Sequence, residues 1–376
     1  MIDLRDIAAQ VVENCTVMDA QHAGGFSICG LALRLRDLFK WEQGLDPWVE
    51  GESGEVLDWI GRREEQWEAA GDSELRPIRI SGKAFDPFDA EGVNEILEPR
   101  GCLYGAGLAG GLVPVFFLAR IEETRRMGDV TVYVLGRELA RGLLTLPALT
   151  RDHTVLLRRE TARRFLWDRI FYAGEGGGEA LRYALGRYGL SGGRPGEIPP
   201  RLDAMVRDEL EVILRHELGE LRDTTFNRTT WREVIGAFPH TPVELLARAV
   251  KDLLADTHEA GTLRYIIDGE RHASLGFYAA FLDGLRKALF PEMAEAFAGF
   301  QESGDWGGML FAFWTELERG GIERALRAAR ARASHHAAVV TAAYERGRAR
   351  DDLPGAETEI EERLLAPLGL HGKEEG

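Results

Sequence analysis

A histidine and three acids lie within the nine residues RHELGELRD, from Arg215 to Asp223. Imidazole and carboxylate groups bind zinc, iron and manganese, and they also act as general acids and bases. The stretch lies in a segment, 201–223, whose apolar residues recur at helical spacing. It therefore raises the question of whether a helix carries a metal or catalytic site here.

Helical phase predicts which of these side chains point toward a core. At about 100° per residue, Glu217 falls near the centre of the apolar face, and Glu209, His216 and Glu220 lie along one border. A buried carboxylate without a partner costs roughly several kcal/mol, so a counter-charge is required. The apolar face itself comprises Leu202, Met205, Val206, Leu210, Ile213, Leu214 and Leu221.

The same test selects one further histidine. His336 lies on the small-residue stripe of segment 321–347 whereas His335 points away, and His258 and His272 fall off the apolar faces of their segments. Such a set of imidazole and carboxylate ligands suits zinc, iron or manganese. A metal site, if present, is predicted from His216, Glu220, Glu209, Glu217 and His336.

The alternative is a buried polar network. Arg271 falls on the apolar side of its own segment and could pair with Glu217. Arginine and carboxylate groups pair readily inside helical domains. The sequence HELGE also lacks the second histidine of the HExxH zinc-protease motif. The network is therefore the favoured interpretation of this segment.

Two further patterns give weaker evidence for a functional site. Gly105, Gly107 and Gly110 form G-x-G-x-x-G, but the next segment contains Pro114 and has strand character, so no helix N-terminus would receive a phosphate. Cys15, His22 and Cys29 are spaced too widely for an ordinary zinc knuckle. Cys15 also continues an apolar helical stripe, which favours a buried structural cysteine.

Composition limits the class of partner and the compartment. The 376 residues carry a formal charge of −16, which argues against nucleic acid and anionic membranes as partners of the whole molecule. The N-terminus has no signal-peptide pattern, and no uncharged apolar run reaches the length of a membrane helix. Three cysteines do not form a disulfide framework in a chain of this size. We expect a cytoplasmic protein.

Element patterns predict an α+β fold in two domains. Residues 1–150 have helical segments first and then strands, with 113–123 and 130–136 joined as a hairpin around Met127 to Asp129. Such a domain holds a small antiparallel sheet packed on helices. Residues 151–350 are predicted to be all-helical and bundle-like, with segments 201–223, 241–259, 270–298, 305–318 and 321–347, and 351–376 to be a polar tail. Thr241 to Glu244 form a capping box that marks one helix start.

Two stretches resemble a known family. HAGGFSICGLALRLRDLFKWEQGLDPW near the start and ASLGFYAAFLDGLRKALFPE near residue 280 are similar to an uncharacterised bacterial family associated with anaerobic deltaproteobacteria. The resemblance implies an N-terminal and a C-terminal domain of unknown function spanning the whole chain. It implies no activity, cofactor or site residue.

The residues therefore leave two classes of function open. The absence of a strong catalytic signature favours a protein that acts by interaction, as an adaptor or regulatory module, through a protein partner or self-association. The competing class is a metal-binding protein or metal-dependent enzyme with its site around His216.

Overall fold

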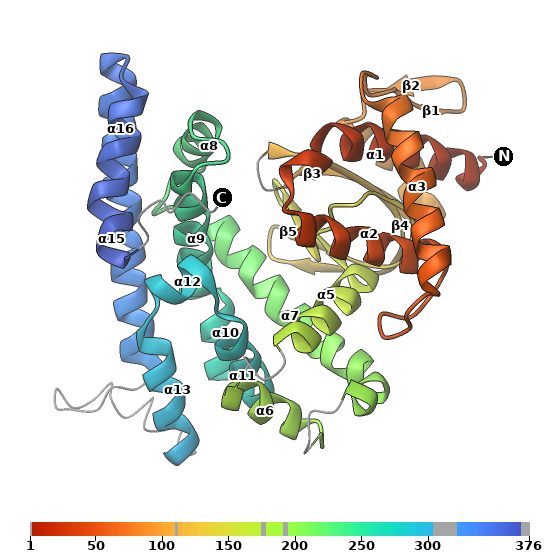
Figure 1. Cartoon of the computed structure of the whole chain (residues 1–376). Helices are drawn as coiled ribbons and strands as arrows, with labels where there is room; N and C mark the ends of the chain where they lie inside the picture. Colours follow the sequence, from red (N-terminus) through yellow and green to blue (C-terminus); the bar gives the residue numbers. More distant parts are fainter. Residues whose placement is uncertain (1, 110–111, 174–177, 191–194, 304–321, 370–376) are drawn as a thin grey trace. The chain divides into compact units, whose positions relative to one another are not determined.

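The computed structural model describes residues 2–109, 112–173, 178–190, 195–303 and 322–369 (Figure 1). The chain divides into two compact units. The first contains residues 1–171 and 202–206, and the second contains residues 172–201 and 207–376. Each described helix is too short or too polar to cross a membrane.

The first unit begins with three helices, as the sequence predicts. Asp3 caps α1 by accepting a hydrogen bond from the backbone N–H of Arg5, and Ser27 caps α2 by accepting one from Gly30. These caps fix where the apolar stripes start. The helices are α1 (Leu4–His22), α2 (Ile28–Glu42) and α3 (Ser53–Ala70).

A five-stranded sheet follows, with the strand order β3-β4-β5-β7-β6. The predicted hairpin is confirmed: β4 and β5 are joined at Gly128, whose φ of 65° suits glycine. The sheet departs from the expected antiparallel pattern because β5 and β7 pair in parallel, and it continues to Arg158. The strands are β3 (Cys102–Leu108), β4 (Pro114–Met127), β5 (Val130–Arg141), β6 (Ala148–Arg151) and β7 (Thr154–Arg158).

Three smaller elements of this unit follow α3 in the sequence and precede the five-stranded sheet. A two-stranded antiparallel hairpin joins β1 (Ile78–Ile80) to β2 (Lys83–Phe85), and α4 (Ala90–Leu97) precedes β3. Helix α5 (Arg159–Ala173) follows β7 directly.

Gly105 and Gly107 lie inside β3, and the next strand, β4, begins at Pro114. A Cβ atom on Gly105 would lie 2.1 Å from the ring of Phe117. The glycines therefore admit neighbouring side chains to the sheet. Gly110 lies outside the described residues.

The core of the first unit forms where α1 covers the sheet. Ile7, Val11 and Cys15 recur at helical spacing and are buried with Tyr104 and Phe116. Burial of an apolar side chain contributes about 1.5–3 kcal/mol, so this contact fixes the face of α1. Cys15 is thereby a buried thiol, as its place on the stripe predicts.

The longer elements described in the second unit are α-helices, whereas residues 154–158 of the segment predicted to be all-helical form strand β7 of the first unit. The helices of the second unit are α6 (Gly178–Arg187), α7 (Pro199–Arg222), α8 (Arg228–Ala237), α9 (Pro242–Asp256), α10 (Thr262–Asp268), α11 (His272–Phe281), α12 (Gly284–Leu289), α13 (Glu292–Ser303), α15 (Ile322–Arg350) and α16 (Leu353–Ile360). Helix α7 includes residues of both units.

The helices of this unit differ from the predicted segments at two places, and a third predicted segment lies outside the described residues. Segment 270–298 is not one helix: it breaks at Asp283, where Gly284 has φ of 49°, and again at Pro291, which lacks the N–H a helix needs. The predicted helix 305–318 lies outside the described residues. Residues 353–368, expected in a polar tail, form helical turns that bury Ile360 and Leu364.

Candidate functional site

Two of the predicted site residues of α7, His216 and Glu220, lie against α9. The two helices approach closely because Gly219 has no side chain: a Cβ atom there would lie 2.2 Å from the carbonyl oxygen of Ala255. Helix α9 begins at the predicted capping box, where the Thr241 side chain accepts from the N–H of Glu244. The Glu244 carboxylate accepts in turn from the N–H of His240.

His216 lies between two carboxylates of α9. Its Nδ1 is 2.8 Å from Asp256 Oδ1, and its Nε2 is 3.9 Å from Asp252 Oδ1. Burial alone would lower the pKa of His216, but the charges of Asp256, Asp252 and Glu217 outweigh it and raise the pKa to about 10. His216 is therefore an imidazolium at neutral pH and has no free lone pair for a metal or a proton.

Asp256 is the most enclosed member of the cluster, with a side chain only 3% exposed. Its second oxygen accepts from the hydroxyl of Tyr278 at 3.1 Å and lies 3.8 Å from Nη1 of Arg286. Burial would raise the pKa of Asp256, yet His216 and Arg286 hold it below its usual value. Burial raises the pKa of Tyr278, so its hydroxyl stays protonated and donates.

Glu220 is neutralised by a lysine. Its Oε1 lies 2.7 Å from Nζ of Lys251, and that ammonium also lies 3.8 Å from the ring centre of Trp231. Burial opposes ionisation of Glu220, but Lys251 and His216 keep its pKa below the usual range. The ammonium group of Lys251 therefore supplies the positive charge that a metal ion would otherwise have to provide for Glu220.

The remaining predicted ligands are placed differently. Glu209 accepts from the Ser274 hydroxyl at 2.7 Å, and burial raises its pKa to about 7. Glu217 is half-buried rather than central to the buried face, where Leu218 lies instead. His336 is buried and His335 exposed, as phase predicts, but Nδ1 of His336 bonds the Arg332 carbonyl of its own helix at 2.8 Å.

Within the described parts of the chain, no three His, Cys, Asp or Glu side chains are arranged to hold a metal ion. The structure brings His216 and Glu220 together with residues of α9. The predicted partner Arg271 lies over the ring of Tyr265, at 4.0 Å from its centre. His272, placed off the apolar face by phase, is half-buried and lies 2.6 Å from the Tyr183 hydroxyl.

Sequence reasoning missed five members of this cluster. Asp252, Asp256 and Lys251 share α9, and Tyr278 and Arg286 come from α11 and α12. Helical phase could not find Asp256, because α9 is buried on nearly every side. The i, i+4 spacing of Asp252 and Asp256 is the one signal that the sequence offers.

The fold and this network define a two-unit α+β protein whose helical unit contains mutually neutralised charges. The chain belongs to the family of unknown function DUF6866: the N-terminal domain matches residues 6–158 and the C-terminal domain matches residues 163–364. No curated protein and no solved structure matches it.

Proposed function

We propose that this protein acts by protein interaction, as an adaptor or regulatory module, and that it docks a basic amphipathic helix on α2. The observation that carries the proposal is an exposed apolar surface on the first two turns of α2. Ile28 is 88% exposed and Leu33 is 40% exposed. With the exposed Cys29 and Ala32 they form what we call the α2 apolar face.

Helical geometry makes this face continuous. Positions 28 and 32, and positions 29 and 33, are one turn apart, so the four side chains lie side by side. Exposed apolar residues that occur singly are ordinary, but a contiguous group is typical of an interaction site. An amphipathic helix covers such a face with its own apolar stripe.

Charge selects the partner. Helix α3 packs against α2 and exposes five acids and one arginine, namely Glu55, Asp58, Glu64, Glu65, Glu68 and Arg62. The whole chain has a formal charge of −16. Complementary charge steers association and suppresses wrong partners, so a helix with lysine or arginine beside its apolar stripe fits best.

The His216 cluster supports the same class of function. Its histidine is charged near neutral pH, and Asp256 and Glu220 each lie beside a cation, so the cluster holds helices together. The second unit is then a stable framework for a binding protein.

The test uses a fluorescent amphipathic peptide built of leucine and lysine, with a leucine and glutamate peptide as its control. We expect the full chain to bind the lysine peptide alone. Ile28→Ser and Leu33→Ser, which leave the charge unchanged, should each weaken binding about tenfold or more. Leu245→Ser, at a position 58% exposed on α9, is the matched control and should bind normally.

Equal affinity of the serine variants and the native chain would refute docking on α2. A native dimer in sedimentation equilibrium that both serine variants lose would assign the face to a second copy of the chain instead, and would overturn the partner proposed here.

A further inference from the structure

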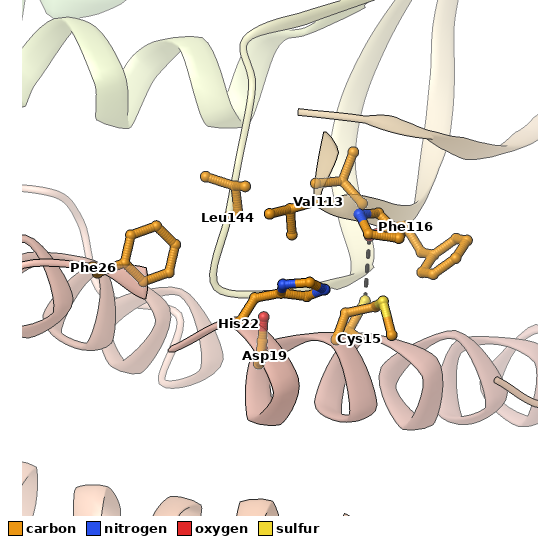
Figure 2. A pocket seen from close by; sticks show the side chains of 11 residues that line it. Cys15, Asp19, His22, Phe26, Val113, Phe116 and Leu144 are labelled. Carbon is orange, nitrogen blue, oxygen red and sulfur yellow. Dashed lines mark hydrogen bonds between the residues drawn. The ribbon is translucent and has the colours of Figure 1, made fainter. Parts of the chain in front are cut away.

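A small pocket opens between α1 and the sheet of the first unit (Figure 2). Cys15, Asp19 and His22 project into it from α1. Its floor is buried and its rim, which includes His22, Phe26 and Leu144, is half-exposed. The cavity has a volume of about 10 Å³, taken as the space open to the centre of a water molecule. It therefore has room for one water molecule or one ammonium group.

Asp19 is a buried polar group of this pocket with acceptor capacity left over. Asp19 is only 9% exposed, and among the residues that the structure describes its two oxygens accept from one donor, the N–H of Leu143, at 3.0 and 3.1 Å. A carboxylate can accept about four hydrogen bonds. Burial raises the pKa of Asp19 to about 7, since this one backbone donor does not compensate for lost water.

The neighbouring charges have partners of their own. Arg63 pairs with Glu42, and Arg141 pairs with Asp37, so these two guanidinium groups act on Asp19 only from a distance. Burial also raises the pKa of Cys15 well above its usual value. Its thiol is neutral and its Sγ donates to the Phe116 carbonyl at 3.3 Å.

Gly142 provides the space beside the carboxylate. A Cβ atom there would lie 3.1 Å from Asp19 Oδ1 and 3.2 Å from Cβ of Cys15. Met18, Phe26 and Leu144 add apolar side chains to the lining of the pocket. The pocket thus has an anionic, water-sized end and an apolar lining.

We propose that this pocket binds a primary ammonium group, with the N–H donors on Asp19 and the attached alkyl chain against the apolar lining. An ammonium head has three donors, no acceptor and the opposite charge, which is what the carboxylate lacks. The His22 ring, which points into the pocket in Figure 2, supplies a second acceptor when neutral.

The source of the ammonium is a lysine side chain of the partner. Phe26 lines the pocket and is followed directly by Ser27, the cap of α2, so the chain leads from the rim of the pocket into α2. Lysine as the source depends on the proposed function, because a basic helix on the α2 apolar face would bring lysines toward the rim. Binding of a free alkylamine rests on the pocket alone.

The experiment measures binding by ligand-observed NMR with the full chain and n-propylamine, with n-propanol as the uncharged probe of equal size. We expect binding of the amine alone. Asp19→Asn keeps an oxygen for the Leu143 N–H but removes the charge, and should weaken binding about tenfold or more. Gly142→Ala should do the same by filling the space, whereas Gly61→Ala, with nothing within 4 Å of its added Cβ, should not.

The pH dependence supplies a second readout. The amine stays protonated, so affinity should rise about fivefold or more from pH 6 to pH 8 as Asp19 ionises. Unchanged binding by folded Asp19→Asn, checked by circular dichroism, or no saturable binding to the native chain, overturns the proposal.

A lysine-containing peptide tests the source. If Asp19→Asn weakens binding of n-propylamine but not of the leucine and lysine peptide, the pocket stands and the partner's lysine is excluded. If the peptide binding depends on Ile28 and Leu33 while the native chain binds no amine, the proposed function stands and the pocket proposal fails.

Discussion

Gly219 of α7 faces the carbonyl oxygen of Ala255 in α9 so closely that a Cβ atom would lie 2.2 Å from it. This approach brings His216, three residues earlier, to the carboxylate of Asp256 at 2.8 Å. The packing of two backbones and the pairing of two charges therefore depend on one missing side chain.

We predict that Gly219→Ala lowers the free energy of unfolding by about 1–3 kcal/mol, because the helices must separate. The gain in helix propensity, about 1 kcal/mol, does not offset this. Chemical denaturation measures the change. Gly186→Ala in α6, where an added Cβ meets nothing within 4 Å, is the control and should be neutral or stabilising. Equal effects of the two substitutions would contradict the close approach.

His216 should remain charged well above neutral pH. Its pKa in the folded state, about 10, exceeds the ordinary value of 6.5, so the stabilisation that it contributes is complete below pH 6.5 and declines as the pH rises toward 10. NMR titration should show no deprotonation of this ring between pH 5 and pH 8. A midpoint near 6.5 would show that the neighbouring carboxylates do not raise the pKa of His216.

Loss of the His216 ring should leave Asp256 buried without its main cation. We predict that His216→Ala lowers the free energy of unfolding by roughly 2–4 kcal/mol. His335→Ala, at an exposed position, should change it by less than about 0.5 kcal/mol. A double-mutant cycle with Asp256→Asn should give a coupling energy above about 1 kcal/mol, and additivity would show that the two groups act independently.

Asp19 should make the folded state less stable as the pH rises, whereas an acid paired with a cation makes it more stable. Its pKa rises from 3.8 to about 7 on folding, so the folded state holds a proton that the unfolded state releases, and stability falls between pH 4 and pH 7. Asp19→Asn should therefore gain stability relative to the native chain by up to about 1.4 kcal/mol per pH unit across this range. A constant difference between the two proteins would contradict the raised pKa.

The three cysteines should differ in reactivity. Cys29 is exposed, whereas Cys15 and Cys102 are buried, and burial raises the pKa of both buried thiols. A thiol reagent should modify one cysteine rapidly in the native protein and three after denaturation. Cys29→Ser should abolish the rapid phase, and its persistence would show that a buried thiol becomes accessible.

Local patterns predicted the elements better than their contacts. The hairpin at Gly128, the start of α9 at Thr241 and the inward orientation of His336 all follow from short-range spacing, and all are confirmed. The breaks at Asp283 and Pro291 were missed because apolar spacing continues across them.

The composition of the His216 cluster could not be predicted in the same way. Phase placed His216 and Glu220 beside a core, but their partners come from α9, which is covered from several sides and so has no clear polar face. Asp256 and Lys251 are buried in spite of their charge because they meet opposite charges there. Tertiary pairing of this kind has no signature in a single sequence.

The parallel strands β5 and β7 also join two charged residues, since Glu138 Oε1 lies 2.7 Å from Nε of Arg158 and both side chains are almost fully enclosed. Replacing either residue alone leaves an unpaired charge in the core, whereas an apolar pair of similar volume can be tolerated. We therefore expect positions 138 and 158 to change together or not at all among members of this family. Two positions twenty residues apart in the sequence would then be substituted as a pair.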